Sequence, residues 1–227
     1  MFLCRTKTRN EKTEKKMIVK TFTFNPFQEN TYLVYDDTKE AMVIDCGCIL
    51  DYEKKAFKQY IIDNELNIVK VINTHLHLDH QFGNKFLNDT YNITPLAHIE
   101  DEFLLENVKS QGAMFGIPVK EDAQTLGGYI EDNQTFTFGN ISFQALHVPG
   151  HSPGSVAIHF EKENAVFVGD VLFKGSIGRT DLPKGDYATL IRSIQNRLFP
   201  LPDSTVVYSG HGPTTTIGEE KVNNPYL

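Results

Sequence analysis

Short apolar runs separated by turn-forming residues dominate the chain, and their spacing predicts its elements. Residues 17–47 are typical of antiparallel strands and hairpins, because β-branched and aromatic runs are broken by NPFQEN and DDTKE. From about 51 to 65 the apolar residues recur at helical spacing, which predicts a helix. The nearly continuous apolar run IVKVINT (68–74) predicts a buried strand, and THLHLDHQFGNKFLNDTY (74–91) continues it through a loop into a helix.

The second half of the chain repeats this order. A short strand is predicted around PLAHI (95–99) and a helix within DEFLLENVKS (101–110). Three later stretches are strand-like and close with glycine next to or near His or Asp: QTFTFGNISFQALHVPG, GSVAIHFEKENAVFVGD and DSTVVYSGHG. A final helix is predicted between the last two of them, in YATLIRSIQNRLF. Because strands followed by a helix occur twice, we expect one α/β domain of two halves packed sheet against sheet, with helices outside.

Composition narrows the function by exclusion. A chain of 227 residues suits one domain. The formal net charge of -7 and the sequence pI near 5.6 provide no positive field for phosphate backbones or anionic lipid. We therefore expect no nucleic-acid partner and no membrane partner, while the sequence leaves the oligomeric state open.

The first sixteen residues differ in charge from the rest of the chain. Six Lys/Arg and two Glu give them +4, which leaves -11 on residues 17–227. We interpret 1–16 as a disordered tail or as an over-long start with Met17 as the true first residue, and a nucleic-acid arm is the minor alternative. Residues 17–227 are then the single domain.

The lack of a recognisable signal peptide or membrane span, together with the odd number of cysteines, favours a soluble, cytoplasmic protein. The apolar MFLC is too short for a signal peptide, and no run approaches the ~18 apolar residues of a membrane span. The three cysteines, an odd number, form no disulfide framework, which fits a reducing compartment. Cys46 and Cys48 flank Gly47 after the run AMVID, and since two thiolates alone are a weak zinc signal, we expect buried structural cysteines.

The segment THLHLDH (74–80) concentrates three histidines and an aspartate behind a predicted strand. Crowding such side chains costs repulsion and desolvation, which a divalent cation offsets. His75 and His77, two apart in extended chain, project to the same side and can hold one ion. Asp79 and His80, at the turn into the helix, then point toward a neighbouring position.

Three further strand ends supply similar side chains. His151 lies in PGHSPG, Asp170 ends the apolar strand VFVGD, and His211 lies in VVYSGHG. Each is flanked by glycine, which lets the backbone turn sharply beside an ion. Together with THLHLDH they provide seven candidate ligands, which predicts a centre of two metals.

The motifs THLHLDH, HVPGHSPGS, GDVLF and SGHG, in this order, resemble the metallo-β-lactamase fold, which implies a four-layer αβ/βα sandwich. DVLFKGSIGRTDLPKGD and YSGHGPTTTIGEEKVNNPYL are more closely similar to the small glyoxalase II-like (hydroxyacylglutathione hydrolase-like) hydrolases of that superfamily, and the resemblance spans about residues 17–227. The ligand set that it implies is His75, His77 and His151 for a first metal, Asp79, His80 and His211 for a second, and Asp170 bridging both.

The resemblance also implies an activity. The expected protein is a metal-dependent hydrolase in which a hydroxide bridging two divalent cations cleaves a thioester or related ester, such as S-lactoylglutathione. Asp79 is then the catalytic residue, because it orients the hydroxide as well as binding the second metal. Zinc suits the nitrogen and oxygen ligands, and iron or manganese fits them as well.

Recognition of glutathione is less clearly implied. The chain stops about sixteen residues after His211, where full-length glyoxalase II enzymes continue into a helical extension. Arg179 falls where those enzymes have a lysine that holds a glutathione carboxylate, a role that a guanidinium can fill. Asp181 and Pro213, however, replace two tyrosines that help to bind glutathione. We therefore expect Arg179 either to bind substrate or to pair internally with Asp181.

The GRTD stretch also resembles persulfide dioxygenases and gives the main alternative. In it, one iron held by His75, His151 and Asp170 would act with oxygen on glutathione persulfide. A metal that only stabilises the fold is disfavoured, because seven ligands exceed the four of a closed structural site. RNA cleavage is disfavoured because the sequence shows neither an accessory domain nor a positive surface, and β-lactam hydrolysis because it shows no export signal.

The remaining polar candidates are expected to support the site or the fold. Asp45, which ends MVID, matches an aspartate that in the family hydrogen-bonds near the metal ligands. His147 lies four residues before His151, and we expect it to support the ligands or the fold. His98 and His159 stand alone beside apolar runs and are expected to be structural.

Overall fold

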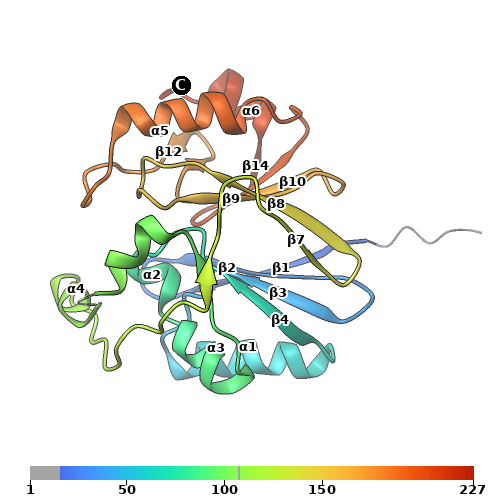
Figure 1. Ribbon diagram of the computed structural model, residues 1–227, viewed down its shortest axis with the longest axis vertical. Helices are drawn as coiled ribbons and strands as arrows, with labels where there is room; N and C mark the ends of the chain where they lie inside the picture. The colour runs from blue at the N-terminus through green and yellow to red at the C-terminus, as the bar shows by residue number, and fades with distance from the viewer. Residues whose placement is uncertain (1–15, 107) are drawn as a thin grey trace, which may run out of the picture.

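The structure, a computed structural model, describes residues 16–106 and 108–227 and has four layers (Figure 1). Two six-stranded sheets lie face to face in the middle, α1 and α3 cover the outer face of one, and α5 and α6 cover the other. This is the predicted α/β arrangement. Of the predicted tail 1–16, all but the last residue lies outside the described residues.

The first sheet has the order β1-β2-β3-β4-β5-β6, with antiparallel pairing as far as β3 and parallel pairing beyond it. Its strands are β1 (Ile18–Phe24), β2 (Glu29–Tyr35), β3 (Glu40–Ile44), β4 (Asn67–Ile72), β5 (Leu96–Ala97) and β6 (Gly128–Tyr129).

The second sheet has the order β14-β13-β10-β9-β8-β7, in which only β10 and β13 pair in parallel. Its strands are β7 (Thr135–Phe138), β8 (Ile141–His147), β9 (Val156–Phe160), β10 (Ala165–Gly169), β13 (Val206–Ser209) and β14 (Thr215–Thr216). A separate hairpin joins β11 (Leu172–Phe173) to β12 (Ser176–Ile177).

The helices connect and cover these sheets. They are α1 (Asp51–Asp63), α2 (Leu78–Gln81), α3 (Asn84–Tyr91), the 3-10 helix η1 (Ile99–Leu105), α4 (Val108–Met114), α5 (Tyr187–Ser193) with its π-helical continuation (Ile194–Leu198), and α6 (Ile217–Asn223). Among the described residues, no helix is both long and apolar enough to cross a membrane.

Strand β2 shows how the sequence builds the layers. All seven of its residues are buried. Tyr32 and Val34 pack into the core between the two sheets, whereas Leu33 and Tyr35 pack against α1 on the other face. The strand begins with buried polar residues, Glu29, Asn30 and Thr31. Its last four side chains are aromatic or aliphatic and alternate between the two cores, because successive side chains of a strand point to opposite faces. Each such side chain contributes roughly 1.5–3 kcal/mol to folding.

Two helical predictions need correction. The single helix predicted at 101–110 is wrong, because the chain forms η1, leaves helical geometry at Glu106 (ψ 139°) and starts α4 at Val108. YATLIRSIQNRLF does contain a helix, but α6 follows it and was not predicted. The sequence carries a signal for α6, because Thr216 caps it by accepting a hydrogen bond from the Glu219 amide, a T-x-x-E pattern.

Candidate metal centre

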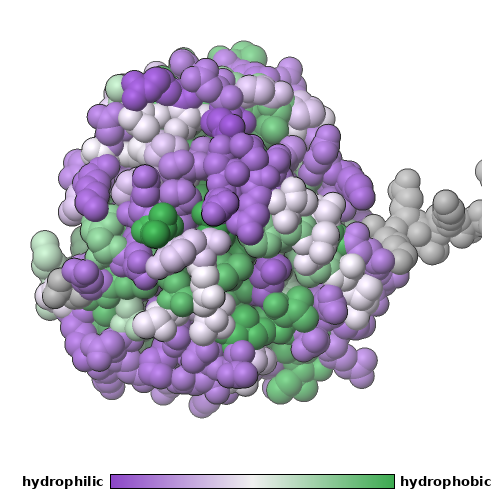
Figure 2. Space-filling view, in the orientation of Figure 1, coloured by the Kyte–Doolittle hydropathy of each residue, from purple (hydrophilic) through white to green (hydrophobic). Residues whose placement is uncertain are grey.

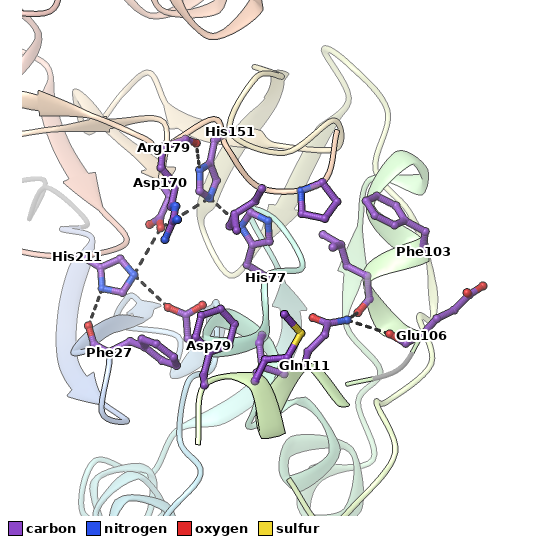
Figure 3. Close-up of a pocket in the computed structure, with 16 residues that line it drawn as sticks. Phe27, His77, Asp79, Phe103, Glu106, Gln111, His151, Asp170, Arg179 and His211 are labelled. Carbon is purple, nitrogen blue, oxygen red and sulfur yellow. Dashed lines mark hydrogen bonds and ion pairs between the residues drawn. The ribbon is translucent and has the colours of Figure 1, made fainter. Parts of the chain in front are cut away.

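The seven candidate ligands lie together where β4, β8, β10 and β13 end, and Figure 3 shows five of them, His77, Asp79, His151, Asp170 and His211. Loops that are far apart in sequence become neighbours there, because strands of both sheets end at the same edge. The positions are His75 and His77 after β4, Asp79 and His80 in α2, His151 after β8, Asp170 after β10, and His211 after β13.

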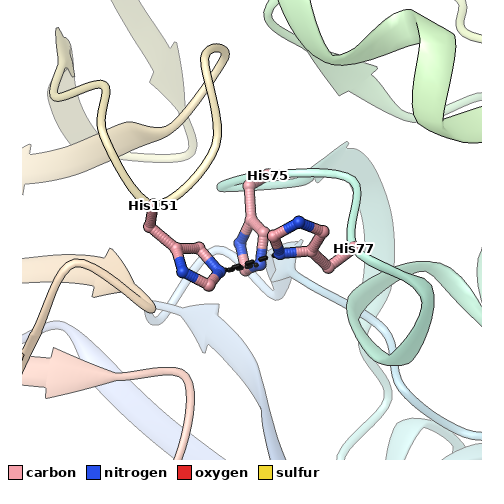
Figure 4. Close-up of side chains that lie close together, drawn as sticks. All are labelled: His75, His77 and His151. Atoms are coloured by element: carbon pink, nitrogen blue, oxygen red, sulfur yellow. Dashed lines mark hydrogen bonds between the residues drawn. The ribbon is translucent and has the colours of Figure 1, made fainter. Parts of the chain in front are cut away.

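His75, His77 and His151 turn their rings toward one another and form a first group (Figure 4). Nε2 of His151 lies 2.8 Å from Nδ1 of His77 and 3.2 Å from Nε2 of His75. His75 and His151 are almost completely buried, at 1% and 2% exposure. Three ring nitrogens therefore converge on one point, and the rings that carry them are largely buried.

In His75 and His151, the hydrogen-bond partner of Nδ1 shows that the lone pair of Nε2 points toward the centre of the first group. Nδ1 of His151 lies 2.8 Å from the carbonyl oxygen of Arg179, which only accepts, so His151 is protonated on Nδ1. Nδ1 of His75 lies 3.2 Å from the Thr74 hydroxyl, which donates its own proton to Asp45. His75 therefore also donates from Nδ1, and its Nε2 is an acceptor. Two acceptor nitrogens 3.2 Å apart cannot bond to each other, but they can share a cation.

Asp79, His80 and His211 form a second group. Nε2 of His211 lies 3.1 Å, and Nε2 of His80 3.8 Å, from Oδ2 of Asp79. Nδ1 of His80 lies 3.0 Å from Oδ2 of Asp45, and Nδ1 of His211 lies 3.0 Å from the carbonyl oxygen of Phe27. Both partners accept, so each imidazole again turns Nε2 toward the group.

Asp170 lies between the two groups. Its Oδ1 is 3.4 Å from Nε2 of His80, and its Oδ2 is 3.8 Å from Nε2 of His151 and 3.5 Å from Nε2 of His211. Glycine at position 210 permits this approach, because a Cβ there would stand 2.2 Å from Asp170 Oδ1. One carboxylate can therefore serve both groups.

Burial and charge set the protonation states of His75, His77 and Asp170. Burial, with repulsion from neighbouring histidines, lowers the pKa of His75 well below its ordinary value and that of His77 to about 3. Burial works to raise the pKa of Asp170, but His80 and the other nearby histidines outweigh it and hold the pKa below its ordinary value. His75 and His77 are thus neutral imidazoles, and Asp170 is a carboxylate.

Divalent metal ions fit the residues present. Nε2 of His80 and Oδ1 of Asp170 are buried and have no hydrogen-bond partner. Burial lowers the pKa of His80, but Asp170, Asp79 and Asp45 together raise it well above its ordinary value, so this corner attracts positive charge. Buried polar atoms are almost always paired, and a divalent cation would satisfy these two.

Two buried carboxylates hold the ligand loops in place. Asp45 was predicted to support the ligands, and it accepts hydrogen bonds from the Thr74 amide at 2.8 Å and from Nδ1 of His80 at 3.0 Å. Asp101 was missed. It accepts from the Leu76 amide at 3.1 Å and from the Ser152 hydroxyl at 2.7 Å, and so ties the loop after β4 to the loop after β8.

One wall of a cavity of about 620 Å³ is formed by members of both groups, His77 and His151 from the first and Asp79 and His211 from the second, together with Asp170 (Figure 3). Arg179 also lines this cavity. Its guanidinium is paired with Asp181, with Nε 2.6 Å from Oδ1 and Nη2 2.7 Å from Oδ2. This is the internal pairing that the sequence left open, and hydrogen bonding to Arg179 lowers the pKa of Asp181 to about 2.

The other candidates are engaged elsewhere. Cys46 and Cys48 are free thiols and are buried, as predicted. Nε2 of His147 lies 2.8 Å from the Pro153 carbonyl oxygen, and Nδ1 of His98 accepts from the Glu100 amide. The His98 and His147 rings stack at 4.1 Å and 12°.

Comparisons with known proteins agree with this geometry. The Metallo-beta-lactamase superfamily profile matches residues 24–211. The chain is 38% identical to the hydroxyacylglutathione hydrolase GloC of Haemophilus influenzae, over 88% of this chain and 93% of that protein. The crystal structure of the BLEG-1 B3 metallo-beta-lactamase is similar at TM-score 0.81 and 38% identity, covering 92% of this chain and 99% of that one. The structure of TTHA1623 in a di-iron-bound form is similar at TM-score 0.82 and 35% identity, covering 92% and 100%.

Proposed function

The chain belongs to the metallo-beta-lactamase superfamily and is a metal-binding hydrolase, and on that premise we propose that it cleaves thioesters at a centre of two divalent cations. The observation that carries the proposal is the pair of ligand groups that share Asp170 on the wall of a cavity. Likeness to the hydroxyacylglutathione hydrolase GloC supports a thioester substrate. Likeness to a di-iron form of TTHA1623 supports two metal ions and leaves iron as a candidate beside zinc and manganese.

In this proposal the ligands keep the arrangement described above. His75, His77 and His151 would hold a first ion, Asp79, His80 and His211 would hold a second, and Asp170 would contribute to both. Cations bound there would polarise the substrate carbonyl and lower the pKa of a water molecule toward neutrality. The site also stays open on its cavity side, where a substrate can approach.

Asp79 is the proposed proton acceptor. Burial raises the pKa of Asp79, but His80 and His211 lower it below its ordinary value, so the side chain on the cavity wall is a carboxylate. In hydrolysis, water adds to the thioester carbonyl carbon and gives a proton to Asp79. The C–S bond then breaks, and the thiolate takes up that proton, which leaves a carboxylic acid and a thiol. Nε2 of His211, 3.1 Å from Oδ2 of Asp79, keeps the carboxylate oriented.

Metal analysis tests the proposal directly. Protein purified without added metal is expected to contain close to two ions per chain and to hydrolyse S-lactoylglutathione. Removal of the metal with a chelator should abolish turnover, and zinc, iron or manganese should restore it. One iron per chain, no thioester turnover and oxygen uptake with glutathione persulfide would instead support the dioxygenase alternative.

β-Lactam hydrolysis is a second candidate, because the structure of the BLEG-1 B3 metallo-beta-lactamase is 38% identical to this chain. The same metal-loaded protein should be assayed with a chromogenic cephalosporin. We expect its kcat/KM to be far below that for the best thioester, and the reverse order would replace the thioester proposal.

The substitution Asp45→Asn tests how the second ion is held. Asparagine is nearly isosteric and tolerates the φ of 51° at this position, but its amide cannot carry the charge that orients the Nδ1 proton of His80. We expect the affinity for the second ion to fall by about 10–100-fold and that for the first ion to fall less, because Asp45 contacts His80 directly but reaches His75 only through Thr74. Titration with a metal-sensitive indicator measures both affinities, and equal weakening of the two would contradict this role.

A further inference from the structure

Away from the ligands, the wall of the cavity is mostly apolar, with Glu106, Gln111 and Arg179 as its polar residues. Its hydrocarbon side chains come from four segments: the β1–β2 turn, α2, the stretch from η1 to α4, and the loop after β12. They are Phe27, Leu78, Phe103, Leu104, Met114, Phe115, Leu182 and Pro183. A cavity of about 620 Å³ with such a lining is within the usual size of a small-molecule site. It has room for considerably more than the three-carbon acyl group of a lactoyl ester.

Several of these side chains face solvent at the mouth of the cavity. Met114 and Phe115 are 83% and 52% exposed, and hydrophobic residues reach the surface around α4 (Figure 2). The Phe115 ring meets the Phe27 ring edge to face at 5.5 Å, so α4 and the β1–β2 turn approach each other across the opening. Large apolar side chains kept in water beside a reaction centre are typical of a surface that a ligand covers.

The charges around the cavity disfavour an anionic thiol. Among the described residues that line it away from the metal centre, Arg179 is the only lysine or arginine, and Asp181 already engages its guanidinium from two residues away. A glutathione carboxylate would have to displace this tethered partner, which is present at high effective concentration. Glu106 also lines the cavity.

A neighbouring groove adds to this negative field. It shares Phe103 and Glu106 with the cavity. Its other charged residues are Glu100, Glu102, Asp122 and Lys184. Asp122 is paired with Lys109 at 2.8 Å. The three remaining carboxylates face one ammonium, that of Lys184, which lies over the Phe103 ring at 3.7 Å. Glutathione, whose two carboxylates outnumber its one ammonium, is repelled by such a field.

We propose that the preferred substrate is a thioester of a bulky hydrocarbon acyl group with a thiol that carries no net negative charge. The inference rests on the proposed function and deepens it. A thioester has two halves, the acyl group and the thiol. The thiols that carry acyl groups are polar, so we assign the hydrocarbon acyl group to the apolar wall. The thiol then lies toward the polar side, near Arg179 and the acidic groove.

The first test varies the acyl group and the thiol separately. The metal-loaded full-length protein is assayed with the acetyl and hexanoyl thioesters of N-acetylcysteamine, a neutral thiol, and with hexanoyl-glutathione and S-lactoylglutathione. We expect kcat/KM for hexanoyl-N-acetylcysteamine to exceed that for the acetyl ester about 50-fold, since each methylene that leaves water favours binding ~4-fold and the cavity is open on one side. We expect it to exceed that for hexanoyl-glutathione about 10-fold.

Phe115→Ala tests the apolar wall. Phe115 is half exposed, so its removal should leave the fold intact. We expect kcat/KM for the hexanoyl ester of N-acetylcysteamine to fall about 10-fold and that for the acetyl ester to change less than about 2-fold. Tyr52→Ala is the matched control, because Tyr52 is 69% exposed on α1 and does not line the cavity.

Asp181→Asn tests the charge argument. Releasing Arg179 should raise kcat/KM for S-lactoylglutathione about 5-fold relative to the neutral esters. An unchanged ratio would show that the ion pair does not exclude anionic thiols and would overturn that half of the inference.

The failures of the two proposals differ. If no thioester is cleaved by metal-loaded protein, the proposed function fails. If S-lactoylglutathione is the best of the four substrates and Phe115→Ala affects both acyl groups alike, the proposed function stands and the inference about the acyl group and thiol is wrong.

Discussion

Asp170→Asn is expected to lower kcat/KM for thioester hydrolysis by at least ~10³-fold and to reduce the bound metal from about two ions per chain to one or none. The carboxylate of Asp170 lies within 3.4–3.8 Å of three histidine Nε2 atoms, one from the first group and two from the second. An asparagine side chain keeps the shape of the aspartate but loses the negative charge that both proposed metal positions share. Elemental analysis and a thioester assay on one sample measure both effects.

The control for this substitution is Asp89→Asn, the same chemical change on α3. Asp89 is half exposed, forms a surface ion pair with Lys85 and stands apart from the ligands. It should leave metal content and turnover unchanged, because such pairs contribute little. An Asp170→Asn protein that kept two ions and wild-type turnover would show that Asp170 does not link the two groups, and the two-metal mechanism would have to be given up.

Much of the candidate centre could be predicted from the sequence, because its ligands lie in motifs at strand ends. His75 and His77 follow an apolar run, and Asp170 closes another, so the pattern that predicts the strands also places these side chains at their ends. The structure brings all seven candidate ligands together. Their roles as ligands stay a prediction until metal is measured.

The groups that orient the ligands could not be found in this way. Asp101 is one of several acidic residues in HIEDEF, and only the folded chain shows that it is fully buried and binds both ligand loops. The carbonyl oxygens of Phe27 and Arg179 fix the tautomers of two histidines. Every residue has a carbonyl group, so no sequence pattern distinguishes these two.

The apolar wall was missed for a related reason. The prediction of one helix over 101–110 ignored the extended backbone at Glu106, which separates η1 from α4 and lets both contribute to the cavity. Phe27 and Phe115 are 88 positions apart, and nothing in their local sequence indicates that they meet. Such contacts depend on how the layers pack, whereas motifs record only neighbours along the chain.

Gly150→Ala is expected to destabilise the fold by about 3–5 kcal/mol and to weaken the first metal position. Gly150 precedes His151 and has a φ of 135°, which L-residues rarely adopt. A Cβ there would stand 2.3 Å from the backbone nitrogen and 2.4 Å from the Cα of Leu190 in α5. These are backbone atoms, so they cannot rotate aside, and the loop must move away from α5 and take His151 with it. Urea unfolding of metal-free protein measures the stability without the contribution of bound metal.

Gly175→Ala separates crowding from backbone strain. Gly175 has a φ of 69°, but nothing lies within 4 Å of a Cβ built on it. Its substitution should cost only the left-handed conformation, about 1–2 kcal/mol, and should leave metal affinity unchanged. If Gly150→Ala and Gly175→Ala lose the same stability, the backbone at Gly150 can move away from α5 with no further loss of stability. The position of His151 then does not depend on the contact with α5. A greater loss for Gly150→Ala, with weaker metal binding, would show that α5 holds the first metal position through the backbone at Gly150.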